Sequence, residues 1–325
     1  YAGRLFLQSN QVDRFMLDQM IAVHRKSLAD LFHGRILKVS SDLLTLLTAL
    51  DLSYELTSND AEVLLSDNIT LVSTDLINAA LPVGIAYEHH WVIDSTNKYL
   101  MDRPHQDETR VCTAEMQISG RGRRGRSWVS PFGKNIYLSW LSTLELPMRE
   151  MTGLSLAVGV RVAALLRRLG CPQVGLKWPN DLMTEAGKLG GILIELEPVT
   201  QNRTRVCIGM GLNVFKAPKS QDIGRSATCL ADFGQWDRTS LIIVLIEELK
   251  QLVDHFDGEQ MHEIQQRWTE LDLYHGRTIS VVQDDQEIEG LNQGIDLQGQ
   301  LVLNCGEKLR YFNAGEVSVR IPESP

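Results

Sequence analysis

The order of apolar and polar positions predicts helices at the start of the chain. Apolar residues recur at helical spacing over residues 15–23 and again over 28–32, and Gly34 is suited to end the second of these helices. A third helix is expected to begin near residues 40–42, where a Ser or Asp side chain can cap it, and to continue along a row of leucines to Leu50. This part of the chain therefore predicts three helices.

A hairpin and a connecting segment follow these helices. Residues 54–56 and 62–65 are short apolar runs of the kind that pair as two strands. Residues 68–82 then indicate a linker that contains a short helix. Three helices and a hairpin outline a winged helix-turn-helix, which we expect over residues 1–82.

The middle of the chain alternates between strand and helix patterns. Strands are expected at residues 89–93, 111–117, 132–140 and 205–215. Helices are expected at residues 149–169, 239–257 and 259–271. Between them, one strand ends before Pro179, which cannot donate to a sheet, and another opens at Lys188. These elements predict an α+β domain over residues 83–273, with a mixed, mostly antiparallel sheet and helices on one side.

The pattern changes again from Tyr274 onward. Short alternating strands, joined by Gly, Asp and Asn turns, are expected at residues 278–282, 286–290, 294–296, 301–303 and 317–320. They predict a small β-barrel over residues 274–325.

Composition limits the class of protein. The chain has 325 residues, 43% of them apolar, which suits two or three globular domains. No apolar run approaches the roughly 20 residues of a membrane span, and no signal-peptide pattern opens the printed sequence. Five cysteines without paired spacing indicate a reducing compartment and no metal site, so we expect a cytoplasmic protein.

Charge argues against strong nucleic-acid binding. The net charge is −9, and the first 85 residues carry six Lys and Arg against ten Asp and Glu. The helix expected to read DNA presents Asp42, Thr45 and Thr48 rather than arginines. Because DNA affinity comes largely from Lys and Arg that neutralise phosphates, we expect the first domain to bind an operator poorly. A domain that contacts protein is the alternative.

One loop concentrates positive charge, Gly120-Arg121-Gly122-Arg123-Arg124-Gly125-Arg126. Glycines let the backbone approach a ligand closely, and arginines bind phosphate or carboxylate. The loop also satisfies the G-x-G-x-x-G pattern of dinucleotide sites, but the following residues 127–131, which include Trp128 and Pro131, do not open a helix. The loop therefore predicts a site for an anionic small molecule, with a solvated basic loop as the alternative.

Three further stretches identify a resemblance. They are Ile93-Asp94-Ser95-Thr96-Asn97, Leu176-Lys177-Trp178-Pro179-Asn180-Asp181-Leu182 and Lys188-Leu189-Gly190-Gly191-Ile192-Leu193-Ile194-Glu195. In this order, with the arginine loop, they resemble the biotin–protein ligases, and most closely the bifunctional bacterial type that also represses the biotin operon. The resemblance runs from about Trp91 to the C-terminus. It implies a central sheet like that of class II tRNA synthetases and a C-terminal barrel like an SH3 domain.

The resemblance also implies roles for residues. For biotin it implies Ser95, Thr96, Asn97, Gln117, Gly120, Arg121, Gly122, Arg123, Lys188 and Gly191. For ATP and the adenylate it implies Arg121, Arg123, Arg126, Trp128, Lys177, Asn180, Lys188 and Asn213. Lys188, Arg123 and Asp181 are the implied catalytic residues, with Asp181 orienting an incoming lysine or accepting its proton. On residue type alone, Lys188 would be solvated surface, Trp178 would be core, and Ser95 would cap a helix.

The implied reaction has two steps. Biotin and ATP, with Mg²⁺ on the ATP oxygens and no metal held by the protein itself, give biotinyl-5′-adenylate. A lysine of the biotin carboxyl carrier domain of acetyl-CoA carboxylase then displaces AMP. Operator DNA and a homodimer are further partners of the bifunctional type. The alternatives are a lipoate–protein ligase, a biotin-sensing repressor without ligase activity, and a binding protein derived from a synthetase. Since every candidate residue lies at or beyond Ser95, we expect the chemistry not to need residues 1–80.

Overall fold

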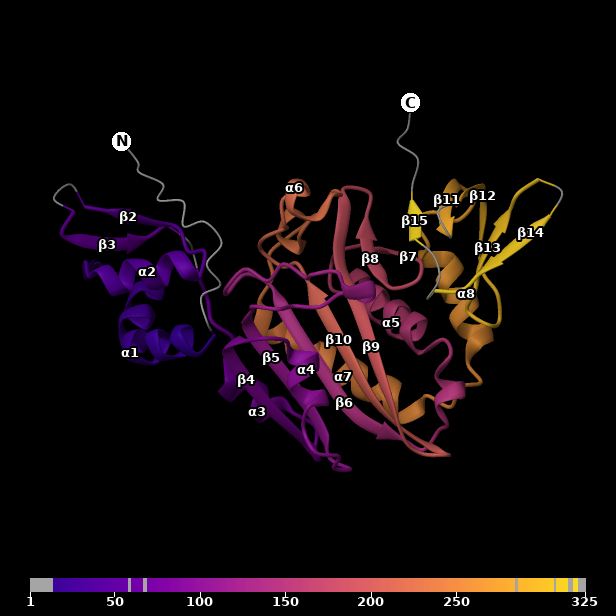
Figure 1. Cartoon of the computed structure of the whole chain (residues 1–325), viewed down its shortest axis with the longest axis horizontal. Helices are drawn as coiled ribbons and strands as arrows, with labels where there is room; N and C mark the ends of the chain where they lie inside the picture. The colour runs from indigo at the N-terminus through magenta and orange to yellow at the C-terminus, as the bar shows by residue number, and fades with distance from the viewer. Residues whose placement is uncertain are drawn as a thin grey trace.

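The computed structural model describes residues 14–57, 60–66, 69–283, 286–306, 308–314 and 318–320. These residues form three β-sheets that follow one another along the chain. A small N-terminal sheet with two helices lies at one end of the molecule, a large sheet fills the middle, and the C-terminal strands lie at the other end (Figure 1).

The N-terminal sheet has the strand order β1 (Leu37–Lys38), β3 (Glu62–Leu65), β2 (Tyr54–Leu56). The predicted hairpin is confirmed as β2 and β3, and the predicted third helix as α2 (Ser41–Ala49). The Ser40 hydroxyl caps α2 by accepting from the Leu43 amide at 3.2 Å. Leucines on the inner face of α2 are fully buried, so packing holds this short helix in place.

The prediction of two helices over residues 15–32 is wrong, because they form one helix, α1 (Arg14–Phe32). Residues 24–27 contain no proline or glycine that would end a helix, and Arg25 and Lys26 are exposed and lie outside the buried stripe. That stripe is made by Leu17, Ile21, Leu28 and Leu31. Only α2 lies between β1 and β2, so residues 14–57 contain two helices and not three. The hairpin tip at residues 58–59 lies outside the described residues.

The central sheet has seven strands. Their spatial order is β4 (Ile85–Ile93), β5 (Thr109–Gln117), β6 (Ile136–Leu144), β10 (Arg203–Leu212), β9 (Gly187–Thr200), β8 (Asp181–Thr184), β7 (Gly175–Lys177). Only β4 and β5 run parallel. The predicted mixed, mostly antiparallel sheet is confirmed. The linker before it contains the short helix α3 (Thr74–Ala80), as expected.

Long helices cover one face of this sheet. They are α5 (Leu154–Arg168), α7 (Arg238–His255) and α8 (Met261–Leu271), and α7 and α8 each pack against α5 or the strands beneath it (Figure 1). Trp268 is fully buried among them, and Trp178 is 4% exposed, which confirms Trp178 as core. The opposite face carries the short helix α4 (Thr96–Met101), whose Leu100 packs on β5, β6 and β10.

Several boundaries differ from the sequence expectation. Strand β6 begins at Ile136 rather than at residue 132, and α5 begins at Leu154 rather than at 149. Pro147 and Gly153, whose φ is +87°, bracket a separate 3-10 turn at Met148–Met151 and prevent the helix from starting earlier. Two smaller helical turns complete this part, α6 (Ser220–Ile223) and a 3-10 turn at Leu230–Asp232.

The C-terminal sheet has five antiparallel strands. Their order is β14 (Leu309–Phe312), β13 (Leu301–Asn304), β12 (Gln286–Ile295), β11 (Thr278–Gln283), β15 (Ser318–Arg320). The two strands expected at 286–290 and 294–296 are one strand, with an irregularity between Asn292 and Ile295 where Gly294 has φ +87°. Strand β14 was not predicted. The α+β fold class is confirmed by the three sheets and their helices.

The N-terminal elements share a hydrophobic core with the central sheet. Val92 of β4 and Phe132 belong to the same buried cluster as the leucines of α1 and α2. The Phe32 ring lies 6.1 Å from that of Phe132 and 6.3 Å from that of Trp91. The first helices are therefore packed onto the strand that leads to Ser95. No helix in the described part of the chain combines the length and apolar composition needed to cross a membrane.

Candidate active site

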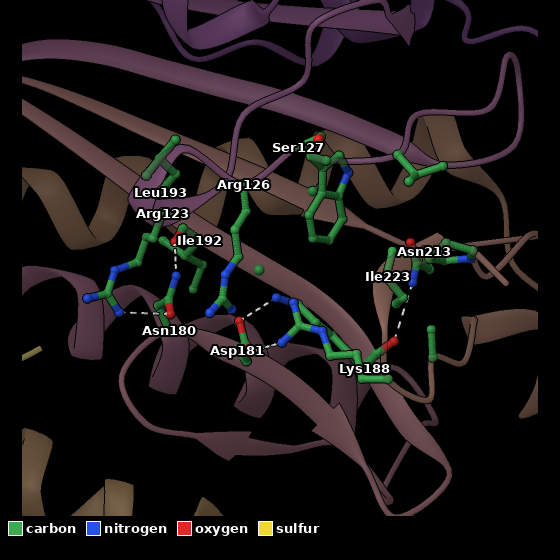
Figure 2. Close-up of a pocket in the computed structure, with 18 of the residues that line it drawn as sticks. Arg123, Arg126, Ser127, Asn180, Asp181, Lys188, Ile192, Leu193, Asn213 and Ile223 are labelled. Carbon is green, nitrogen blue, oxygen red and sulfur yellow. Dashed lines mark hydrogen bonds and ion pairs between the residues drawn. The ribbon is translucent and has the colours of Figure 1, made fainter. Parts of the chain in front are cut away.

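A cavity of about 1200 Å³ lies on the α4 side of the central sheet and gathers the three motifs. It is bounded by the arginine loop, the start of α4, strands β7 to β10 and residues 218–227. Every residue that the resemblance implied lines this cavity, except Gly120. Gly120 instead supports the loop: a Cβ there would lie 2.5 Å from the Trp128 carbonyl oxygen. Motifs that are distant in the sequence therefore meet at one site (Figure 2).

One side of the cavity, at the end of β4, is lined by uncharged side chains that form hydrogen bonds. We call these residues, 95–97 and Gln117, the cradle. Ser95 caps α4 by accepting from the Lys98 amide at 3.4 Å, so its expected role as a cap is also correct. The Gln117 Oε1 atom accepts from the Thr96 amide at 2.9 Å, and Asn97 Nδ2 donates to Glu195 at 2.8 Å. These interactions hold the polar side chains of residues 95–97 in place beside the cavity. Each of these three residues is at most 4% exposed.

Sequence reasoning missed two supports of this cradle. Ser139 of β6 lies with its Oγ 2.7 Å from Thr96 Oγ1 and 2.5 Å from Asn97 Oδ1. At Gly209 of β10, an added Cβ would lie 2.1 Å from Asn97 Oδ1, so only glycine leaves room for the amide. The sequence feature that could have revealed these two supports is a serine and a glycine at inward positions of otherwise apolar strands.

The arginine loop is a closed turn. The Gly122 amide donates to the Arg126 carbonyl at 2.7 Å, and the Trp128 amide donates to the Gly120 carbonyl at 2.8 Å. Arg124 and Gly125, with φ of 58° and 70°, take the left-handed conformation that reverses the chain. A single 3-10 turn at Arg123–Gly125 is followed by an extended segment and not by a helix. The dinucleotide-binding interpretation is therefore wrong.

The loop reaches two other parts of the chain through its arginines. Arg121 Nη2 lies 2.9 Å from Glu195 Oε2. Arg123 Nη1 donates to Asn180 Oδ1 at 3.2 Å (Figure 2), and its Nη2 donates to the Ala314 carbonyl in the C-terminal segment. Burial lowers the pKa of Arg123, although Asp181 opposes this. The loop thus closes one wall of the cavity and connects it to the C-terminal sheet.

Positive side chains surround one buried carboxylate. Asp181 Oδ1 accepts from Lys188 Nζ at 2.5 Å, and Oδ2 accepts from Arg225 Nη1 at 3.1 Å (Figure 2). Burial tends to raise the pKa of Asp181, but Lys188 and Arg225 outweigh it and hold the pKa below its usual value. Burial lowers the pKa of Lys177, which lines the same region, to about 8. Arg225, which sequence reasoning missed, follows Gly224 in a segment that had no assigned motif.

The floor of the cavity is a flat apolar surface beside which two buried polar atoms have no hydrogen-bond partner among the described residues. A Cβ at Gly211 would lie 2.3 Å from the Trp128 indole, so the ring lies directly on β10. Lys188 Nζ lies 5.3 Å from the centre of that ring. Trp128 Nε1 and Asn213 Oδ1 are buried without a hydrogen-bond partner among the described residues. Buried polar atoms are normally paired, so both atoms are available to a ligand.

The two sides together suit a ligand with a neutral polar end and an anionic end. The cradle at residues 95–97 and 117 offers amide and hydroxyl groups. Around Asp181, the positive charges of the neighbouring side chains outnumber its single negative charge. Fixed cations in a partly enclosed site stabilise negative charge that develops during a reaction. The arrangement suits acyl or phosphoryl transfer between anionic reactants.

Two family models match this chain. The Biotin/lipoate A/B protein ligase family matches residues 91–213, which contain the cradle, the arginine loop and the cation cluster up to Lys188. The Biotin protein ligase C terminal domain matches residues 274–320, which form the SH3-like C-terminal sheet. Both lie where the resemblance in the sequence placed them.

Whole proteins and solved structures agree with these models. Bifunctional ligase/repressor BirA of Escherichia coli (strain K12) is 40% identical over 235 residues, 71% of this chain and 73% of that protein. The Salmonella typhimurium protein of the same name is 38% identical over 262 residues, 80% and 82% of the two chains. The biotin protein ligase from Aquifex aeolicus, solved in complex with biotin and ATP, matches with a TM-score of 0.59 and 26% identity, over 72% of this chain and 98% of that one. On these similarities in sequence and fold, the chain belongs to the biotin protein ligase family.

Proposed function

We propose that this protein joins biotin to a carrier protein in two steps, through biotinyl-5′-adenylate. The observation that carries the proposal is the cavity in which a neutral cradle and a cluster of cations face the same space. Biotin has a neutral ureido ring at one end and a carboxylate at the other, and its adenylate places a phosphate next to that carboxylate. A relative named Biotin--[acetyl-CoA-carboxylase] ligase and the solved biotin protein ligase from Aquifex aeolicus support this choice of substrate.

In the first step, a carboxylate oxygen of biotin attacks the α-phosphorus of ATP and pyrophosphate leaves. Both reactants are anions, so the cations must offset their repulsion and the charge that grows on the leaving group. We assign this task to Arg121, Arg123 and Lys188. The cradle of residues 95–97, with Gln117, would hold the ureido ring, and Gly191 leaves space beside it: a Cβ there would be 3.1 Å from Lys188 Nζ.

The nucleotide would occupy the remaining part of the cavity. We assign the adenine or ribose to Trp128 and Asn213, because each keeps an unpaired polar atom beside a flat surface. Lys177, Arg126 and Asn180 would face the phosphates. The Asn180 amide is itself fixed, since its Nδ2 donates to the Ile192 carbonyl at 2.5 Å.

Mg²⁺ enters this reaction with ATP. No group of three or more His, Cys, Asp or Glu side chains in the described part of the chain is arranged to hold a metal ion. Both oxygens of Asp181 already contact cations. Such a donor set fits an ion held by the phosphate oxygens, rather than by a protein cage. Bound there, Mg²⁺ would neutralise part of the phosphate charge.

In the second step, the ε-amine of a carrier lysine would attack the acyl carbon and displace AMP. The biotin carboxyl carrier domain of acetyl-CoA carboxylase is the acceptor that we propose, because relatives carry the name Biotin--[acetyl-CoA-carboxylase] ligase. Lipoate is the competing substrate, since one family model covers both ligases. The match to a biotin-specific C-terminal domain favours biotin.

Operator binding is a second candidate function, because the relatives from Escherichia coli and Salmonella typhimurium are named as ligase and repressor. The described N-terminal residues offer few groups for it. The Thr45 and Thr48 hydroxyls donate back to the Ser41 and Leu44 carbonyls of their own helix, at 2.8 and 2.9 Å. Asp42 lies exposed in the first turn. We propose that operator binding is weak, and that a homodimer would be needed to assemble any basic surface.

We further propose three domains, at residues 1–82, 83–273 and 274–325, and a cytoplasmic location. Each of the three sheets falls within one of these ranges. The location is supported by the five cysteine thiols, all of them free.

The test of the ligase proposal is a transfer assay. The full chain is incubated with radiolabelled biotin, MgATP and an apo carrier domain, and label on the carrier is measured. Radiolabelled lipoate in place of biotin is the matched control. Label from biotin alone supports the proposal, whereas preference for lipoate or no transfer to the carrier contradicts it.

A further inference from the structure

The transfer step needs a base, because a lysine ammonium must lose a proton before its nitrogen can attack the acyl carbon. Asp181 was the candidate from the sequence. In the structure its Oδ1 accepts from Lys188 at 2.5 Å and its Oδ2 accepts from Arg225 at 3.1 Å, and 14% of its side chain is exposed. Each oxygen therefore already faces a cation. A carboxylate stabilised in this way holds a proton weakly and makes a poor base.

Lys177 lies in the same cavity but differs from Lys188 in its contacts. It is the last residue of β7 and stands opposite Asp181 in the β7–β8 ladder. Lys188 is bound to the Asp181 carboxylate, whereas no hydrogen bond or ion pair joins the Lys177 side chain to another residue within the described ranges. Its amine is therefore available to whatever enters the cavity.

The charges that face Lys177 come from several elements. Asp181 of β8 favours the ammonium form, while Arg225, Lys188 of β9 and Arg126 of the loop oppose it. Burial is the largest cause of the shift and, together with these cations, brings the pKa of Lys177 to about 8. With this pKa, about a tenth of Lys177 is an uncharged amine with a free lone pair at pH 7, and about half at pH 8.

We propose that Lys177, and not Asp181, accepts the proton of the incoming lysine in the transfer step. The inference rests on the proposed ligase function and adds to it the base of the second half-reaction. In the first half-reaction the same side chain would be an ammonium, because the ATP phosphates next to it favour the charged form. Departure of pyrophosphate removes that anion, and Lys177 then releases its proton to water.

Besides the carrier lysine, the adenylate and Lys177, the transfer step needs only water. The Lys177 lone pair takes one proton from the carrier ammonium. The neutral carrier nitrogen forms the bond to the acyl carbon, and the bond between that carbon and the phosphate oxygen breaks with its electron pair going to AMP. The new amide nitrogen loses its second proton to water. Lys177 then loses its proton to water and returns to the neutral amine.

The experiment measures single-turnover transfer from ready-made biotinyl-adenylate, bound to the full chain, to an apo carrier domain between pH 6.5 and 9.5. Supplying the adenylate keeps the test independent of the first step. Lys177→Arg retains a positive charge but cannot titrate in this range. Hydroxylamine, which is uncharged at these pH values, serves as a second nucleophile that needs no base. Lys250→Arg, on the exposed side of α7 and paired with Asp254, is the matched control.

We expect transfer by the unchanged protein to rise with pH and to level off near pH 8. The transfer rate of Lys177→Arg should not level off near pH 8. At pH 8 this variant should transfer biotin to the carrier about 100-fold more slowly, which is the size of a general-base contribution. Its reaction with hydroxylamine should change by only a few fold, and Lys250→Arg should match the unchanged protein throughout.

Two results would overturn the inference. The first is a Lys177→Arg variant that transfers at the normal rate with the normal pH profile. The second is an equal loss with the carrier and with hydroxylamine, which would show that Lys177 only positions the adenylate. Failure of the unchanged protein to transfer biotin at all would instead count against the proposed ligase function.

Discussion

At the scale of single residues, the Lys and Arg side chains that line the cavity outnumber its Asp and Glu side chains. Lys188 is 7% exposed and is bound to Asp181, so it is a fixed cation rather than a mobile surface lysine. Burial lowers the pKa of Lys188, and the Asp181 carboxylate opposes this. A cation fixed in this way needs no reorganisation when negative charge develops next to it.

We therefore expect Lys188→Ala to slow the adenylation step more than it weakens substrate binding. Removing one preorganised charge of this kind costs about two to three orders of magnitude in rate. Rapid-quench measurement of biotinyl-adenylate from biotin and MgATP gives the rate, and titration of biotin alone gives the binding. Lys98→Ala, a change at an exposed lysine of α4 paired with Asp102, should leave the rate unchanged. Near-normal adenylate formation by Lys188→Ala would show that the lysine has no part in this step.

The residues of the site that could be predicted from the sequence are those in short motifs. Residues 93–97, 120–126, 176–182 and 188–195 each place their side chains by local chain geometry, at a strand end, in a turn or next to a glycine. Ser139 and Arg225 could not be found in this way, because they reach the site across the sheet or from an irregular segment. The roles of Asp181 and Lys177 also depended on contacts between strands, which one sequence does not show.

At the scale of elements, a buried ion pair joins helix α7 to strand β5. Arg238 Nη1 lies 2.7 Å from Glu115 Oε2, and both side chains are at most 2% exposed. The Val72 amide of the linker donates to the same carboxylate at 2.8 Å, and Arg238 Nη2 donates to the Thr70 carbonyl at 2.6 Å. Because Gln117 lies two residues after Glu115, this pair fixes the strand that delivers Gln117 to the cavity.

We expect Glu115→Gln to destabilise the fold by about 3–5 kcal/mol, as removal of one partner from a buried pair usually does. Burial raises the pKa of Glu115, but Arg238 and His89 outweigh it and bring the pKa to about 2. A folded-state pKa below the unfolded value of about 4.3 stabilises the fold above pH 4.3, and this contribution is lost as the pH falls toward 2.

Urea unfolding between pH 7 and pH 3 measures this prediction. The stability gap between the unchanged protein and Glu115→Gln should narrow toward pH 3. Glu263→Gln is the matched control, because Glu263 pairs with Arg267 on α8 with 65% of its side chain exposed, and should change stability by less than about 0.5 kcal/mol. A gap that stays constant with pH would mean that the Glu115 carboxylate has no part in the stability difference.

Element prediction located most of the helices and strands of the described residues, but it divided α1 and missed β14. Strands β2, β3 and β5 and helices α2 and α7 were found within a few residues. Helix α1 was divided because its buried stripe, spaced by four, seven and three residues, is narrower than the set of apolar residues around it. Strand β14 was missed because three of its four residues are exposed, so no alternation marks it.

At the scale of the whole molecule, the N-terminal elements are part of the structure that holds the cavity. Arg14 of α1 lies 3.3 Å from Asp94, the residue before Ser95, and Lys216 after β10 lies 3.0 Å from Asp51 after α2. Phe132 and Val92 are buried against the first helices. The sequence placed all candidate chemistry beyond residue 80, but these contacts make us expect a cost when residues 1–80 are removed.

Two truncations separate the contributions of the helices and the linker. A chain that begins at residue 69 keeps the Val72 and Thr70 contacts to Glu115 and Arg238, whereas a chain that begins at residue 84 loses them. We expect thermal stability to fall in both and to fall further in the shorter one, with a higher KM for biotin. Unchanged melting temperature and KM in the shorter chain would show that the N-terminal elements are independent of the cavity.

We expect the full chain to bind its operator weakly, although the relatives from Escherichia coli and Salmonella typhimurium are named as ligase and repressor. Affinity for DNA rises with the number of Lys and Arg side chains that are free to neutralise phosphates. The basic residues that a dimer could bring together are Arg25, Lys26, Arg35 and Lys38. Arg35 is paired with Asp30 at 2.6 Å, and the Arg25 guanidinium lies 5.2 Å from the centre of the Trp91 ring, which leaves Lys26 and Lys38.

Acidic residues add to this effect. Asp42 lies in the first turn of α2 and would hold its carboxylate near the DNA phosphates. The two negative charges repel each other within a Debye length of about 8 Å at physiological salt. An anisotropy titration with labelled DNA from the organism's own biotin promoter, in the presence of biotin and MgATP, measures the affinity, and DNA of unrelated sequence is the control. We expect similar, weak binding to both, near the non-specific range of about 10⁻⁴–10⁻⁶ M. Nanomolar binding to the promoter alone would contradict the prediction, and would require a second copy of the chain or residues outside the described ranges to supply the missing positive charge.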